Sequence, residues 1–119
     1  GTTTSNLKNT YGEILLERDG TSVATGRTFL GSLFGDHCKT AIGTLLPTGS
    51  VIGVGANVFG RGAPPRTVPA MAWGLDGETV NLEGFLRTAE RMMQRRKVPF
   101  TDQLRGFLTS IHDFATSSP

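Results

Sequence analysis

The most regular pattern in the chain is a six-residue period between residues 28 and 63. In six consecutive blocks the first residue is mostly apolar or β-branched, and the fifth is always small. The first positions are Thr28, Phe34, Thr40, Leu46, Ile52 and Val58, and the fifth positions are Ser32, Cys38, Thr44, Ser50, Ala56 and Gly62. Helices repeat about every 3.6 residues and strands every two, so neither explains this period. It is typical of a parallel β-helix, in which three blocks of six close one coil of 18 residues.

Residues 7–27 interrupt the six-residue period. Two strand-like runs, 14–16 and 21–24, flank the sequence Arg18-Asp19-Gly20. An Asp-Gly pair between strand-like runs is a strong signal for a tight hairpin. We therefore expect a β-hairpin, inserted at about residues 7–27, that protrudes from the coils.

The C-terminal part of the chain changes to helical spacing. The tandem prolines Pro64 and Pro65 stop strand pairing, and the residues up to 77 are expected to run over the end of the coils. Two helices should follow, the first ending before Pro99 and the second capped by Thr101. Their apolar stripes are Leu82, Phe85, Leu86, Ala89, Met92 and Met93, then Leu104, Phe107, Leu108, Ile111 and Phe114. The sequence thus predicts β-helix coils, hairpin and covering loop over residues 1–77, and a helical extension over residues 78–119.

Charge, hydropathy and cysteine content exclude several kinds of partner and site. The formal net charge is only +2, and the basic run at 91–97 suits the C-terminus of a helix. Nucleic acid is therefore not an expected partner. Membrane is not expected either, because no apolar run is long enough to span a bilayer. The single cysteine, Cys38, excludes an internal disulfide framework and favours the cytoplasm. Since the chain starts at Gly1 without Met, we expect it to be a piece of a longer protein.

Several segments carry specific motifs. They are Gly1-Thr2-Thr3-Thr4-Ser5-Asn6, Gly35-Asp36-His37-Cys38-Lys39-Thr40, and residues 48–60, 68–74 and 89–96. These segments resemble the C-terminal half of a bacterial family of sugar-phosphate nucleotidyltransferases. That family is similar to the bifunctional N-acetylglucosamine-1-phosphate uridyltransferase/glucosamine-1-phosphate acetyltransferase and to other hexapeptide-repeat acyltransferases.

The resemblance implies a left-handed parallel β-helix that assembles as a homotrimer. The chain would be the acyltransferase-like C-terminal domain of a nucleotidyltransferase. It would bind a sugar phosphate and an acyl-CoA, and move an acetyl group from acetyl-CoA to an amino-sugar phosphate. Mg would be needed only in the nucleotidyltransferase domain, which would precede Gly1.

Five residues are candidates for the site. His37, at a predicted corner, is a candidate general base for an amine that attacks a thioester, or else a surface histidine with a structural hydrogen bond. Lys39 can hold a phosphate or be a solvated surface charge. The resemblance implies a substrate contact for Asn6 and coenzyme A contacts for Cys38 and Ala56. By residue type alone, Asn6 is equally a turn residue and Cys38 a small buried hydrophobe.

Two departures from the family keep a second interpretation open. The base histidine of the bifunctional enzyme would lie before Gly1, and the tyrosine that follows the family's asparagine is Leu7 here. The alternative is a catalytically inactive trimerisation and regulatory module. No spacing of His, Cys, Asp and Glu indicates a metal site, and His112 in the second predicted helix is expected to be solvated.

Overall fold

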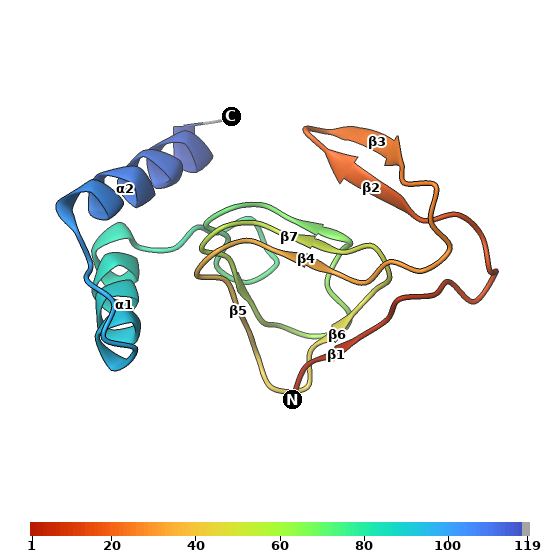
Figure 1. Ribbon diagram of the computed structural model, residues 1–119, viewed down its shortest axis with the longest axis horizontal. Coiled ribbons are helices and arrows are strands. Elements are labelled where there is room, and N and C mark those ends of the chain that lie inside the picture. The colour runs from red at the N-terminus through yellow and green to blue at the C-terminus, as the bar shows by residue number, and fades with distance from the viewer. Residues whose placement is uncertain (118–119) are drawn as a thin grey trace.

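The computed structural model describes residues 1–117, so the last two residues of the predicted 78–119 unit lie outside it. In residues 1–117 short strands are followed by two helices (Figure 1). The elements are β1 (Thr3–Thr4), β2 (Leu15–Arg18), β3 (Thr21–Ala24), β4 (Leu33–Phe34), β5 (Lys39–Thr40), β6 (Leu45–Leu46), β7 (Val51–Ile52), β8 (Asn57–Val58), β9 (Thr67–Val68), α1 (Leu82–Arg95) and α2 (Asp102–Ser117).

Most strands pair in parallel with a strand far along the chain. β4 pairs with β7 and β7 with β9, while β5 pairs with β8 and β1 with β6. In two pairs of strands, residues 18 positions apart lie side by side, beginning with Leu33–Val51 and with Lys39–Asn57. The six-residue period explains this offset, because three blocks of six residues bring the chain back beside the strand that lies 18 residues earlier.

The predicted fold class, a left-handed parallel β-helix, is wrong for this structure. Residues 1–117 contain separate sheets of two or three short strands, one of them antiparallel, and no closed or coiled solenoid. The 18-residue offset is not sustained. It becomes 16 between Val51 and Thr67, after the tandem prolines, and the hairpin segment separates β1 from its partner β6. The chain is a mixture of small sheets and two helices.

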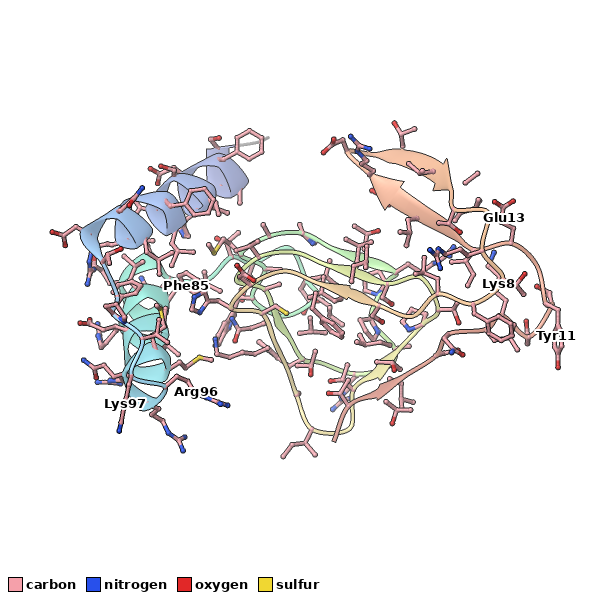
Figure 2. The ribbon with its side chains drawn as sticks, viewed as in Figure 1. Lys8, Tyr11, Glu13, Phe85, Arg96 and Lys97 are labelled. Atoms are coloured by element: carbon pink, nitrogen blue, oxygen red, sulfur yellow. The ribbon has the colours of Figure 1, made fainter. Side chains whose placement is uncertain are left out.

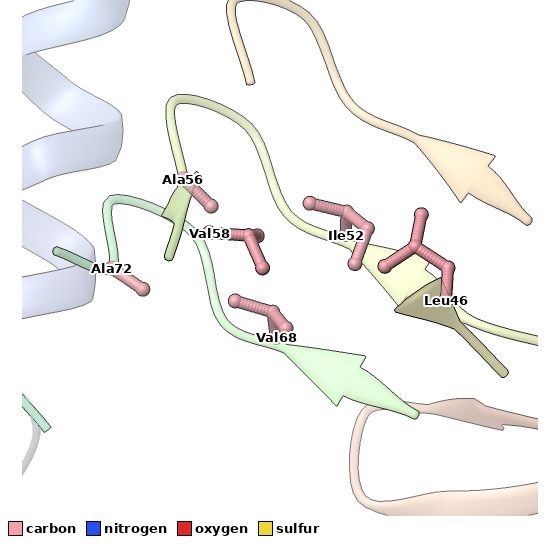
Figure 3. Close-up of a cluster of buried hydrophobic side chains, with 6 residues drawn as sticks. All are labelled: Leu46, Ile52, Ala56, Val58, Val68 and Ala72. Carbon is pink, nitrogen blue, oxygen red and sulfur yellow. The ribbon is translucent and has the colours of Figure 1, made fainter. Parts of the chain in front are cut away.

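The strands enclose a small apolar core (Figure 3). Its buried members are Leu46, Ile52, Ala56, Val58, Val68 and Ala72, and Cys38 and Leu75 pack against them. Turns between the strands approach one another closely. A Cβ atom at Gly35 would lie 2.6 Å from the backbone nitrogen of Val54, so only glycine allows the two turns to stack.

The hairpin and both helices lie where the sequence predicts them. β2 and β3 pair antiparallel around Asp19 and Gly20, whose φ angles of 51° and 80° suit a primed hairpin turn. Arg66 secures the hairpin base, since its Nη2 donates to the carbonyl of Leu15 at 2.9 Å. The hairpin lies at the end of the molecule away from α1 and α2 (Figure 1).

Both helices begin at a side-chain cap. The Asn81 side chain accepts a hydrogen bond from the Gly84 N–H at 2.9 Å, and Thr101 Oγ1 accepts from Leu104 N–H at 3.1 Å.

A second apolar cluster joins the helices to the strands and consists of Met71, Val80, Phe85, Leu86, Ala89 and Leu108. No helix in the described residues is both long enough and apolar enough to cross a membrane.

Candidate functional site

A cleft of about 480 Å³ lies between the strands and the N-terminal half of α1. We call it the α1 cleft. Its lining residues are Lys39, Asn57, Trp73, Thr79, Val80, Asn81, Gly84, Phe85 and Thr88. Ligand pockets for small molecules are typically about 300–1,000 Å³ and mostly apolar with a few polar groups. The α1 cleft fits that description.

One wall of the cleft is a row of three residues, two on neighbouring strands and one in an isolated parallel bridge. Lys39 on β5 is in register with Asn57 on β8, and Asn57 is in register with Trp73 in a further parallel bridge. A cation, an amide and an indole are therefore adjacent on one wall, although they are far apart in the sequence. We call these three residues the ladder.

The opposite wall is the first two turns of α1. Phe85, buried in the second apolar cluster, points from α1 toward the strands (Figure 2). The N-terminus of α1 carries the positive end of the helix dipole, and its capping residue Asn81 lines the cleft. The cleft thus places a helix N-terminus opposite the ladder.

His37 lies beside the cleft, in the turn between β4 and β5. Its ring contacts the Phe85 ring edge-on, with 6.1 Å between centroids, and its carbonyl accepts a hydrogen bond from Lys39 Nζ at 3.3 Å. Partial burial, and next the ammonium of Lys39, lower the pKa of His37 below 6.5, while Asp36 acts in the opposite direction. Burial and the Lys39 ammonium thus both favour the neutral imidazole, which is the form that can accept a proton.

Burial also shifts the pKa values of Cys38 and Lys39, the two residues that follow His37. It lowers the pKa of the Lys39 ammonium, opposed by Cys38, and raises the pKa of the Cys38 thiol. A raised thiol pKa disfavours the thiolate, which is the nucleophilic form. Cys38 is thus a packing residue here, and it does contact the core of Figure 3.

The structure does not bring all five predicted site residues together. Lys39 lines the α1 cleft and His37 lies beside it against Phe85, whereas Asn6 is not among the lining residues. Lys8, two residues beyond Asn6, lies on the side of the molecule away from α1 (Figure 2). Ala56 has no exposed surface, so in this packing it offers none to coenzyme A.

His112 is not solvated as expected. Its ring is mostly buried, and Nε2 lies 2.9 Å from the carbonyl oxygen of Val80, so Nε2 carries the proton. The second nitrogen, Nδ1, is buried and has no hydrogen-bond partner among the described residues. Because Val80 lines the α1 cleft, α2 supports the wall of the cleft through this hydrogen bond.

Sequence reasoning missed Asn57 and Trp73. A signal existed for Asn57, since it lies 18 positions after Lys39 and shares its row. Trp73 lies only 16 positions after Asn57, so a strict six-residue period does not reach it. Its place in the ladder follows from the shortened segment around Pro64 and Pro65.

In the part of the chain that the structure describes, no three His, Cys, Asp or Glu side chains gather as a metal site. No family model, curated protein or solved structure matches this chain.

Proposed function

We propose that the chain is the acyltransferase-like C-terminal domain of a cytoplasmic sugar-phosphate nucleotidyltransferase. Its reaction would transfer an acetyl group from acetyl-CoA to an amino-sugar phosphate. The observation that carries this proposal is geometric: the His37 imidazole packs against Phe85 in the wall of the α1 cleft, and Lys39, whose Nζ donates to the His37 carbonyl, lines the same cleft. A base and a phosphate-binding cation close together are what the acetylation of an amino-sugar phosphate requires.

The step assigns one role to each residue. The amine nitrogen of the acceptor attacks the thioester carbonyl, and the C–N bond forms while His37 takes the proton from that nitrogen. The C–S bond then breaks, and coenzyme A leaves as a thiolate that takes up a proton and becomes the thiol. Lys39 binds a phosphate group by charge-assisted hydrogen bonds and orients the reactants.

The first test is acetyl transfer to glucosamine-1-phosphate by the full chain, with and without His37→Asn. Asparagine tolerates the left-handed backbone at this position but cannot act as a base. We expect the rate of transfer to fall about 10²- to 10⁴-fold, with the acetyl-CoA Kd from calorimetry unchanged. Tyr11→Asn is the matched control, because it places asparagine at another left-handed position, with φ of 60°, in an exposed residue on the side of the molecule away from α1 (Figure 2). Equal rates for wild type and His37→Asn would remove His37 from the mechanism.

A second candidate, a trimerisation and regulatory module without chemistry, is favoured by a different observation. Large apolar side chains on the strands and turns are strongly exposed, among them Ile42 at 96%, Leu45 at 59% and Phe34 at 51%. Such side chains favour an interface between copies of the chain. A trimer that neither binds acetyl-CoA nor transfers acetyl would support this candidate over the first.

A further inference from the structure

We infer that the ladder of Lys39, Asn57 and Trp73 is a nucleotide-binding site, in which Trp73 stacks on the base and Lys39 binds phosphate. The observation behind it is the juxtaposition of a cation, an amide and an indole in one register on one wall of the α1 cleft. The inference shares Lys39 with the proposed function, but nucleotide binding and acetyl transfer by His37 are measured separately.

The spacing of the ladder suits a nucleotide. Parallel strands lie about 4.8 Å apart, so the backbones of Lys39 and Trp73 are about 10 Å apart across Asn57. That separation is comparable to the distance from the base to the second phosphate of a nucleoside diphosphate. Asn57 lies between the two ends, where its amide can donate to or accept from the edge of the base or the ribose.

Trp73 is held firmly enough to act as a stacking platform. Its backbone N–H donates to the carbonyl of Glu78 at 2.8 Å, and the next N–H, of Gly74, donates to the carbonyl of Asn57 at 2.9 Å. Phe59 contacts the indole edge-on, with ring centroids 5.0 Å apart. The side chain is still 47% exposed, so a flat ligand has access to it. Stacking of a base on an aromatic side chain contributes about 1–3 kcal/mol.

The end of the cleft at Lys39 has an electrostatic environment that suits a phosphate group. Lys39 is the charged side chain among the lining residues, and none of those residues is acidic. The positive end of the α1 dipole faces the same space, and it adds a favourable field for an anion. An uncharged planar ligand would leave the partly buried ammonium of Lys39 without a counter-charge.

Two ligands carry a base and a diphosphate in this arrangement. One is a free nucleoside diphosphate, and the other is the nucleotide end of a coenzyme A thioester. Calorimetry with ADP, coenzyme A, adenosine and pyrophosphate as probes separates them. We expect ADP to bind more tightly than adenosine or pyrophosphate alone, because the ladder recognises both ends. Displacement of ADP by coenzyme A would identify the acyl donor as the source. ADP binding without coenzyme A binding would identify a free nucleotide.

Two ladder variants and two controls test the assignment to these residues. Trp73→Leu and Lys39→Met should each weaken ADP binding about tenfold, whereas Trp73→Phe should retain most of it. Phe107→Leu and Lys8→Met remove an exposed aromatic and a lysine elsewhere on the chain, and should leave the Kd unchanged. Circular dichroism confirms that each variant is folded.

Two results would overturn the inference. One is the absence of ADP binding at about 1 mM by the folded wild-type chain. The other is equal ADP affinity in wild type, Trp73→Leu and Lys39→Met. If acetyl transfer persists in either case, the proposed function survives and only the nucleotide site is lost.

Discussion

At the scale of single residues, His37 combines an unusual backbone with a shifted imidazole. Its φ of 59° lies in the left-handed region, where histidine is several-fold enriched relative to most side chains. The turn brings the ring against Phe85 and next to Lys39, and both the burial and the ammonium disfavour protonation. The local sequence Asp36-His37-Cys38-Lys39 indicated a corner, but the contact with Phe85 depends on how α1 packs.

The lowered pKa of His37 predicts a pH dependence of stability. Below pH 6.5 the unfolded chain binds more protons at this residue than the folded chain, so the free energy of unfolding falls as the pH decreases. Well above pH 6.5 the imidazole is neutral in both states, and this effect disappears. We expect the Tm to fall more steeply from about pH 7.5 to about pH 5.5 in wild type than in His37→Asn.

Differential scanning calorimetry of both proteins at matched ionic strength measures the two slopes. His112 and the carboxylates are common to wild type and His37→Asn, so the difference between the slopes isolates His37. Parallel slopes would show that the surroundings of His37 do not lower its pKa.

At the scale of elements, helix ends show how much local sequence decides. Asn81 and Thr101 cap α1 and α2, and Thr101 was predicted as a cap from its position alone. The end of α1 is less obvious. Lys97 N–H donates to the Gln94 carbonyl and Val98 N–H to the Met93 carbonyl, which together form a Schellman motif. Lys97, with φ of 57°, occupies the position where glycine is usual.

Lys97→Gly is therefore expected to raise the free energy of unfolding by about 0.5 kcal/mol. Relief of the left-handed strain, about 1 kcal/mol, is partly offset by the greater freedom of glycine in the unfolded chain. Urea unfolding measures the difference. Arg96→Gly is the control, because Arg96 has φ of −95° and gains nothing from glycine. Its stability should fall, and a gain for Arg96→Gly as large as that for Lys97→Gly would contradict the argument.

At the scale of the whole molecule, the exposed apolar side chains predict self-association. We expect light scattering to give a mass of about three times 12.7 kDa. A double variant, Ile42→Asp with Leu45→Asp, should lower the mass to that of the monomer, because charges do not tolerate burial in an interface. Phe107→Asp on α2 is the control and should leave the trimer intact. A wild-type monomer at all concentrations would contradict the trimer.

Much of the fold was predictable because it depends on contacts within a few residues or on one simple period. The Asp19-Gly20 turn, the helical stripes and the Thr101 cap all act locally. The six-residue period placed Leu33 beside Val51 and Lys39 beside Asn57. It did not determine that the strands would stay two residues long and remain in separate sheets, and the fold class inferred from it was wrong.

The sequence by itself determined the hairpin, the two helices and the 18-residue pairs at Leu33–Val51 and Lys39–Asn57, and it placed His37 and Lys39 at one turn. The tertiary structure alone decided the cleft. Trp73 joined the ladder because the proline segment shortened the offset, and α1 closed the opposite wall because Phe85 packed into the second apolar cluster. His112 became buried because α2 packs where the His112 ring can form a hydrogen bond with the Val80 carbonyl. These outcomes depend on how separate elements pack together, and no local pattern encodes that packing.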